Sequence, residues 1–345
     1  MRSALLFFLA ALLLLPLVVH GDCDCDCSAD EEARDKKAAR PLKIVAIFSI
    51  LVCGSIGVCI PILGKWIPAL DPDRDAFFVI KSFAAGVILA TAFVHILPDS
   101  FDSLTSSCLH PDPWHNFPFA GFGAMIAAIG TLTIDTLATG YFGRPHDAVS
   151  DETKTDVEIR SAVVHEENVH VHTHAHAHGH PSPQLIRHRV ISQVLELGIV
   201  VHSVIIGIAL GSSETPSTIK PLVVALSFHQ FFEGVGLGGC LVQAKFNPRS
   251  AATMGLFFSL TTPVGVAVGM GLSSAYDENS PTALIVEGLL NSASAGILIY
   301  MSLVDLLAQD FMNPRVQSKG RPLQVGINIS LLAGAGLMSL LAKWA

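Results

Sequence analysis

The chain has 345 residues, of which 51% are hydrophobic and only 14% are charged, with a mean hydropathy of +0.54 and a formal net charge of −8. A soluble domain carries about 25% charged residues, so this chain has too few charges to cover a globule of its size. Its apolar residues lie in long blocks, which excludes an ordinary soluble protein and favours one that crosses the membrane several times.

The first apolar run covers residues 4–19, between Arg2 and a polar exit around Gly21 and Asp22. A short basic region, an apolar stretch of this length and a small-residue exit are typical of a secretory signal peptide. We therefore expect residues 1–21 to be cleaved, which places the mature N-terminus outside the cell. The alternative is a first transmembrane anchor, for which the run is short, because a bilayer needs about 20 residues.

The tail at 22–41 contains the sequence CDCDC, in which Cys23, Cys25 and Cys27 alternate with aspartates. Thiolates and carboxylates on one segment could collect a metal ion, or the thiols could form disulfides in an oxidising compartment. No pairing follows from this spacing.

Eight apolar segments follow, and each can cross a hydrocarbon core of about 30 Å as a helix. The expected fold class is therefore all-α: a polytopic membrane protein whose eight transmembrane helices form a bundle, with helices 1–3 within 42–142 and helices 4–8 within 190–345. The segments are 42–63, 77–97, 119–142, 190–212, 222–242, 251–272, 283–307 and 325–341.

If the N-terminus is outside, eight crossings place the C-terminus outside as well. The distribution of Lys and Arg residues agrees with this topology. The expected outer loops 99–118 and 275–282 contain no Lys or Arg, and 213–221 contains only Lys220, whereas every expected inner loop is basic. Because Lys- and Arg-rich loops stay in the cytosol, both termini are expected to be extracellular. The basic tail before the first helix is the exception, and the cleaved signal would hold it outside.

The only long hydrophilic connection, at 143–189, is expected in the cytosol and largely disordered. We expect its histidines to form changing, weak chelates that capture or sense metal in the cytosol; the alternative is a solvated low-complexity loop without a role. These histidines are His170, His172, His174, His176, His178 and His180.

Ionisable groups inside membrane spans are costly and therefore mark functional candidates. His202 lies in the fourth span, and His229 and Glu233 lie four residues apart on one face of the fifth. If these spans pack together, the three side chains can converge on Zn²⁺ or Fe²⁺. Small-xxx-small glycine pairs in both spans, Gly207 with Gly211 and Gly234 with Gly238, favour that packing. The alternative is a structural hydrogen-bonded pair of His229 and Glu233.

Five further polar residues are candidates for an entrance or a pathway. His95 and Asp99 are four residues apart at the outer end of the second span and could form an entrance. Asp135, Glu287 and Asp305 lie within the third and seventh spans. For these residues, hydrogen bonding between helices is an equally good interpretation.

Four stretches make the chain resemble the ZIP (Zrt-, Irt-like protein) metal transporters, and in particular their plant zinc and iron members. The resemblance covers essentially the whole mature chain, including its eight spans and its histidine-rich inner loop. The stretches are FAAGVILATAFVHILPDS, HSVIIGIALG, HQFFEGVGLGG and NSASAGILIYMSLVDLLA.

This resemblance implies a central metal site in spans four and five, with His202, His229 and Glu233 as ligands. Some relatives have further ligands where this chain has Ser203 and Ile206, and relatives with two bound metals have an Asp or Asn in place of Gln230. They also have a Glu in span six where Thr262 aligns. We therefore expect a site for one metal ion, with Ser203 and Gln230 as secondary polar contacts through water.

The resemblance implies uptake of zinc, and also of iron, cadmium or manganese, into the cytosol through a multi-pass protein of the plasma membrane. The metal ion is a transported substrate, no prosthetic group is expected, and the partners are the ion and the lipid bilayer, with a homodimer left open and no nucleic acid. An iron-selective transporter, a cation-diffusion exporter and a metal-responsive receptor are the alternatives. An enzyme is not expected, because HQFFE lacks the second histidine of an HExxH metalloprotease helix.

Overall fold

The computed structural model describes residues 35–64, 74–142, 183–272, 280–312, 314–318 and 320–343. The predicted signal peptide, the cysteines of the N-terminal tail and the histidine tract lie outside the described residues, so these remain predictions.

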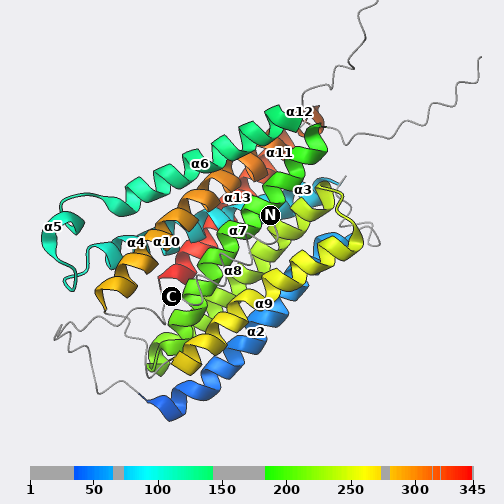
Figure 1. Cartoon of the computed structure of the whole chain (residues 1–345). Helices are drawn as coiled ribbons and strands as arrows, with labels where there is room; N and C mark the ends of the chain where they lie inside the picture. The colour runs from blue at the N-terminus through cyan, green and yellow to red at the C-terminus, as the bar shows by residue number, and fades with distance from the viewer. Residues whose placement is uncertain are drawn as a thin grey trace, which may run out of the picture.

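Eight described helices, some of them continuous runs of two or three elements, are long and apolar enough to cross a membrane (Figure 1). They correspond one for one to the eight predicted segments, which confirms the all-α membrane fold. Two short helices, α5 (Pro111–Trp114) and α12 (Pro314–Ser318), lie in connections. The eight are α2 (Lys36–Leu63); α3 (Asp75–Ala90) with the π-helix η3 (Thr91–Ile96) and α4 (Leu97–Leu104); α6 (Phe119–Phe142); α7 (Pro183–Ser212); α8 (Pro216–Gln243); α9 (Pro248–Leu272); α10 (Pro281–Tyr300) with the π-helix η4 (Met301–Ala308) and α11 (Gln309–Phe311); and α13 (Arg321–Ala342).

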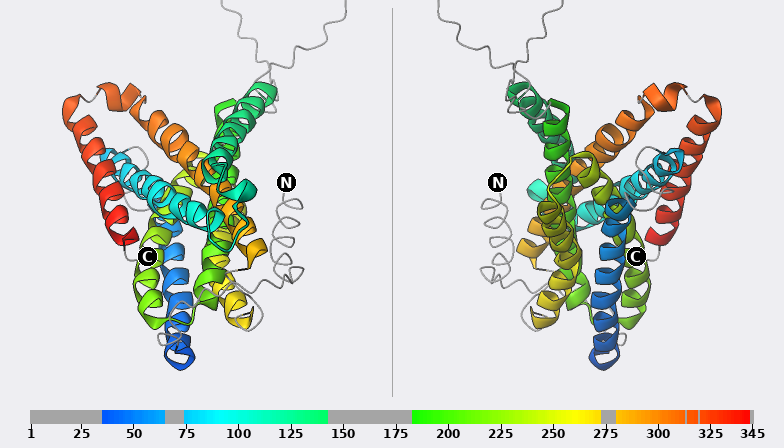
Figure 2. Two further views of the ribbon diagram at one scale, coloured as in Figure 1. Left: turned by 90° about the vertical axis from the view of Figure 1, so that its left-hand side faces the viewer. Right: turned by 90° about the vertical axis from the view of Figure 1, so that its right-hand side faces the viewer.

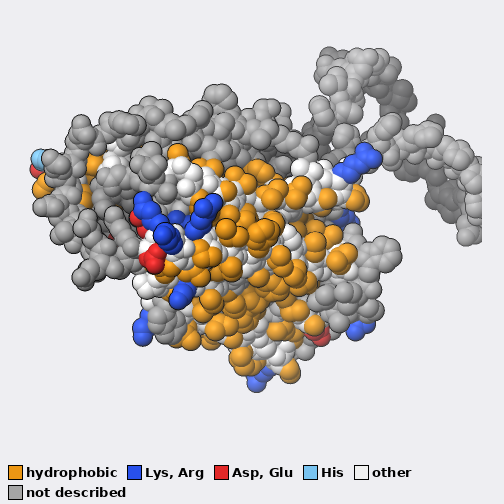
Figure 3. Space-filling model, turned by 90° about the horizontal axis from the view of Figure 1, so that it is seen from below, with side chains coloured by type: hydrophobic (Ala, Val, Ile, Leu, Met, Phe, Trp, Pro, Cys, Tyr) orange, Lys and Arg blue, Asp and Glu red, His pale blue; other side chains and the backbone are white. Residues whose placement is uncertain are grey.

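The outside of the bundle is apolar, as a lipid environment requires. Phe48 on α2, Leu137 on α6 and Leu332 on α13 are all more than 60% exposed. In Figure 3, hydrophobic side chains cover the middle of the face seen from below, and Lys and Arg side chains lie toward its margins. A soluble protein would bury such a surface, whereas the hydrocarbon core of a bilayer covers it.

Contacts between the connections define two ends of the bundle. At the α7–α8 end, Lys36 forms an ion pair with Glu214 at 2.9 Å, and the Asp35 N–H donates to the Glu214 carbonyl. At the opposite α8–α9 end, the Arg189 side chain donates to the Ala244 carbonyl at 3.4 Å. The helices therefore run up and down between these ends, in the order that the predicted spans require.

Glycines let several helices approach backbone to backbone. On α7, a Cβ added at Gly211 would lie 2.3 Å from the Val266 carbonyl oxygen of α9, and one at Gly207 would lie 2.7 Å from the Thr262 carbonyl oxygen. On α8, a Cβ at Gly238 would lie 2.6 Å from the Val58 carbonyl oxygen of α2. Close approach is therefore confirmed, but the expected partners were wrong: the α7 glycines pack on α9 and the α8 glycines pack on α2, so they do not join α7 to α8.

Figure 2 shows the consequence of this packing for the shape of the bundle. The helices fan apart toward the α8–α9 end, with α6 and α7 on one side and α11 and α13 on the other. The histidine-bearing parts of α7 and α8 lie in the middle of their helices, away from both ends.

Candidate metal centre

Three buried histidines from three helices face one another in the middle of the bundle. His95 comes from η3, His202 from α7 and His229 from α8, and none is more than 5% exposed. Their ring centroids lie 5.8 Å apart for His95–His202, 6.1 Å for His95–His229 and 5.9 Å for His202–His229. The rings therefore form a nearly regular triangle. Glu233, which is fully buried, follows His229 by one turn on the same face of α8.

These side chains carry polar atoms that no other described residue satisfies. They are Nε2 of His95, both ring nitrogens of His202, Nδ1 of His229 and both carboxylate oxygens of Glu233. A buried polar group without a partner costs about 1–3 kcal/mol, and a charged group costs more. Because neither Glu233 oxygen has a hydrogen-bond partner among the described residues, His229 among them, these two side chains do not form the structural hydrogen-bonded pair that was the alternative interpretation. The cluster has the character of a ligand set.

The three imidazole rings lie slightly farther apart than they would around one bound metal ion. With Zn–N distances of about 2.0–2.1 Å and tetrahedral geometry, the centroids of two ligating imidazoles lie about 5 Å apart. Accordingly, among the residues that the structure describes, no three His, Cys, Asp or Glu side chains already surround a common point at ligand distance. Rotations that draw each pair of rings together by roughly 1 Å would let the same nitrogens reach one cation.

His95 reaches this cluster from an irregular stretch of the second span. The helix widens into a π-turn over Thr91–Ile96, just before Pro98. A proline lacks the N–H of a regular helix, and its ring clashes with the carbonyl four residues earlier, so the α-helical pattern must change there. Single π-turns are frequent at functional sites, because they re-aim the side chains that they carry. His95 also contacts the predicted entrance residue Asp99, with 3.6 Å between Nδ1 and Oδ2.

The predicted secondary contacts directly follow His202 and His229 in the chain. Ser203 and Gln230 are each at most 2% exposed. The Thr262 hydroxyl donates to Gln230 Oε1 at 3.1 Å, and Gln230 Nε2 donates to the Phe258 carbonyl at 3.5 Å. The amide of Gln230 is thus engaged by α9. Gln230 and Thr262, the two positions at which the sequence resemblance implied a difference from two-metal relatives, contact each other as a neutral pair.

The other pathway candidates lie toward the two ends. At the α7–α8 end, Ser100 donates to the Gly288 carbonyl at 2.7 Å, which brings the Asp99 segment against α10 beside Glu287. Asp135 accepts a hydrogen bond from Tyr300 at 3.4 Å, and Asp305 accepts one from Gln309 at 3.5 Å. Asp135 and Asp305 are both buried, and their contacts fit the interpretation that these residues form structural hydrogen bonds.

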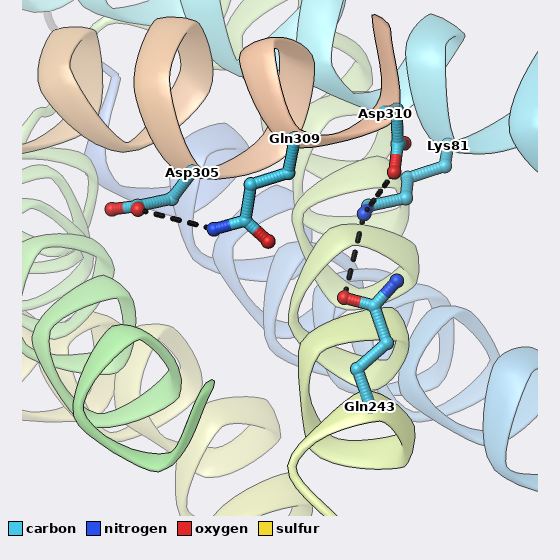
Figure 4. Close-up of polar contacts among 5 residues, drawn as sticks. All are labelled: Lys81, Gln243, Asp305, Gln309 and Asp310. Carbon is cyan, nitrogen blue, oxygen red and sulfur yellow. Dashed lines mark hydrogen bonds and ion pairs between the residues drawn. The ribbon is translucent and has the colours of Figure 1, made fainter. Parts of the chain in front are cut away.

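A polar network that the sequence did not predict lies near the α8–α9 end (Figure 4). Lys81 of α3 forms a buried ion pair with Asp310 at 2.9 Å and donates to Gln243 Oε1 of α8 at 3.4 Å. Figure 4 shows Lys81 between these two partners, with Asp305 and Gln309 on the adjacent turn. The only sequence signal was a lysine inside an apolar span, which is costly unless it is paired.

Comparison with known proteins finds relatives that match the chain over most of its length. Residues 40–342 match the family described as ZIP Zinc transporter. The chain is 60% identical to Zinc transporter 8 of Oryza sativa subsp. japonica, with 92% of each chain covered, and 53% identical to Zinc transporter 3 of Arabidopsis thaliana, with 99% of this chain and 98% of the relative covered. It is also 46% identical to Fe(2+) transport protein 1 of Oryza sativa subsp. japonica, over 96% of this chain and 91% of the relative.

These matches cover all eight membrane-crossing helices and the histidine cluster. They confirm the resemblance on which the expected transport function rested, and they confirm that the chain is a transporter rather than an enzyme. The chain belongs to the ZIP zinc transporter family.

Proposed function

We propose that this protein carries divalent cations, zinc above all, across the plasma membrane into the cytosol, and that His95, His202, His229 and Glu233 hold the ion on its way. The observation that carries the proposal is the buried triangle of imidazoles with its unsatisfied nitrogens. The relatives named as zinc transporters support zinc as the principal substrate, and the relative named as an Fe(2+) transport protein keeps iron as a competing one.

The ligand set suits a transported ion. Neutral imidazoles and one carboxylate are donors that Zn²⁺ and Fe²⁺ both accept. One carboxylate leaves a divalent ion with a net positive charge, so the ion is held less tightly than in a charge-neutral site. Transport needs this balance, because an ion must bind well enough to be selected and weakly enough to leave.

The neutral pair of Gln230 and Thr262 supports a site for one metal ion. Both side chains are nearly inaccessible, and each satisfies the other through their 3.1 Å hydrogen bond. A second divalent ion beside the first would need anionic ligands to offset the repulsion between two cations in a medium of low dielectric constant. We therefore propose a mononuclear centre, with Ser203 and Gln230 contacting the ion only through water.

An ion enters, in this proposal, from the α7–α8 end and leaves at the α8–α9 end. Asp99, with its side chain 40% exposed, contacts His95, so it offers a carboxylate between the surface and the cluster. The distribution of Lys and Arg supports placing the α7–α8 end outside. The histidine tract would then meet ions in the cytosol and serve in regulation rather than in the transport step.

Uptake of radioactive zinc by metal-starved cells tests the proposal, with iron, manganese and cadmium as competitors. His202→Ala and Glu233→Ala are compared with the wild type at equal surface expression, with His115→Ala, at an exposed position in the 105–118 connection, as the matched control. We expect uptake to fall at least about tenfold in the first two variants, since even residues that only support a metal ligand cost 10–100-fold. His115→Ala and a deletion of 170–180 should retain uptake. Normal uptake by both His202→Ala and Glu233→Ala would refute the central site.

A further inference from the structure

A groove of about 600 Å³ opens on the side of the bundle between α2 and α9, with α8 as its floor. This volume lies within the range of about 300–1,000 Å³ that is usual for small-molecule sites. The walls are mainly apolar. They include Ser55, Cys59 and Ile62 of α2, Leu241 of α8, and Ala252 and Leu256 of α9.

The groove runs along the helices rather than across them. Its lining spans residues 55–62 of α2 and 248–259 of α9, which corresponds to roughly 10–16 Å at the rise of an α-helix. It therefore extends from the α8–α9 end to about the midplane of a 30 Å hydrocarbon core. Cys59, Ala252 and Leu256 are exposed, so the groove is open sideways to the surrounding lipid. A hydrocarbon chain from one leaflet has this shape and direction.

The mouth of the groove is basic. Lys245 lines it and is exposed, and Arg249, also exposed, lies in the first turn of α9 next to the lining residue Pro248. The Arg189 guanidinium lies 5.7 Å from the centroid of the Phe246 ring, another part of the lining. No lining residue is Asp or Glu, and within the described residues neither Lys245 nor Arg249 has an ion pair. The positive end of the α9 dipole adds to this charge.

We propose that this groove binds one phospholipid with a negatively charged headgroup, taken from the leaflet at the α8–α9 end. One acyl chain lies along Leu241, Ala252 and Leu256, and the phosphate and the anionic headgroup contact Lys245 and Arg249. The shape selects a lipid over a soluble anion, and Lys245 and Arg249, which form no ion pair with another described residue, select an anionic over a zwitterionic headgroup. Each Lys or Arg near the surface contributes about fivefold to such binding. This inference is independent of the transported metal.

Native mass spectrometry of the purified full-length protein tests the headgroup preference, with phosphatidylserine and phosphatidylcholine of identical chains as the probes. The wild type should bind phosphatidylserine at least about fivefold more tightly than phosphatidylcholine. Lys245→Gln should remove about fivefold of the phosphatidylserine binding and weaken phosphatidylcholine binding less, because phosphatidylcholine shares the phosphate but lacks the anionic headgroup. The matched control is Lys220→Gln, which removes an exposed lysine near the other end of α8 and should change neither lipid.

A second pair of variants tests the groove itself. Ala252→Phe fills the groove from an exposed position and should weaken both lipids, whereas Val264→Phe, exposed on α9 outside the groove, should weaken neither. Equal binding of the two lipids by the wild type would overturn the inference. Phosphatidylserine binding that is unchanged in both Lys245→Gln and Ala252→Phe would also overturn it. An equal loss of phosphatidylserine binding in Lys220→Gln and in Lys245→Gln would do the same, because it would show an effect of net charge alone. The unfolding temperature of each variant confirms that it remains folded.

Discussion

Glu233 and the three histidines contribute different things to a bound cation. The carboxylate of Glu233 supplies the only charge of the ligand set, and both of its oxygens are buried without a partner among the residues that the structure describes. The imidazoles of His95, His202 and His229 supply direction, because a neutral imidazole has a single in-plane lone pair, on the one ring nitrogen that carries no proton. Three helices must therefore be in place before the site exists, and a change in their spacing would alter its affinity. This coupling between helix position and ligand geometry is what a carrier needs.

His95 gives the first prediction, which separates a ligand from an entrance residue. His95→Ala should lower zinc uptake as severely as His202→Ala, by at least about tenfold, because the triangle loses one of its three rings. The measurement is zinc uptake at equal surface expression over a range of zinc concentrations. A variant that recovers the full maximal rate at high zinc would assign His95 to the entrance and remove it from the ligand set.

Sequence reasoning could predict three of these four side chains, for identifiable reasons. His229 and Glu233 are one helical turn apart, so their shared face follows from the periodicity alone. His202 is the only histidine in its span. His95 could not be assigned to them, because that required knowing which face of the second span turns inward. The π-turn before Pro98 changes that face locally, and helical periodicity does not show such a turn.

At the scale of the helices, glycine contacts determine which ones pack closely. The sequence identified the α7 and α8 glycines as sites of close approach, yet it could not identify their partners, because the small-xxx-small pattern describes one helix only. On α9, Gly265 and Gly269 present the complementary surface: a Cβ at Gly269 would lie 2.3 Å from the Ile208 carbonyl oxygen. Backbone atoms cannot move aside as a flexible side chain can.

A matched pair of glycine substitutions on α9 tests this packing. Gly269→Val should destabilise the protein by about 3 kcal/mol, the upper part of the range for overpacked interiors. Gly271→Val changes the same helix by the same residue type, but a Cβ there meets nothing within 4 Å. It should be close to neutral. The midpoint of thermal unfolding in detergent distinguishes the two, and similar midpoints for both variants would show that the α7–α9 contact is not close.

The buried ion pair of Lys81 and Asp310 gives a prediction about how α3 and α11 are joined. Their side chains are only 3% and 6% exposed. Lys81→Met leaves a buried carboxylate without its partner and should cost about 3–5 kcal/mol of stability. Replacing both residues, as Lys81→Met with Asp310→Leu, should restore most of that loss, because apolar pairs often replace buried ion pairs at little cost. A double variant as unstable as Lys81→Met alone would contradict this account.

For the whole molecule, hydropathy predicted the number and order of the membrane-crossing helices. The long apolar blocks are sufficient for this, since only a helix of about 20 residues satisfies its backbone inside a bilayer. The pairing of those helices was not predictable, because an apolar surface has the same composition whether it faces lipid or another helix. The 62% exposure of Phe48 and the burial of Phe258 illustrate this.

The orientation of the bundle is a prediction at the same scale. In a background without the seven native cysteines, Ser217→Cys at the α7–α8 end should react with a membrane-impermeant maleimide in intact cells. Asn247→Cys at the α8–α9 end should react only after the cells are permeabilised. Both positions are exposed, so access should depend on the side of the membrane alone. Labelling of Asn247→Cys in intact cells would reverse the orientation, and with it the direction of uptake.

Zinc K-edge X-ray absorption of the purified protein, loaded with one equivalent of zinc, tests the central claim most directly. The protein should lack residues 170–180 and carry serine at Cys23, Cys25 and Cys27, so that neither segment competes for the ion. The account predicts nitrogen and oxygen ligands only, at about 2.0–2.1 Å, with the scattering pattern of several imidazoles that weakens in His202→Ala. A sulfur ligand at about 2.3 Å, or a spectrum unchanged by His202→Ala, would contradict it.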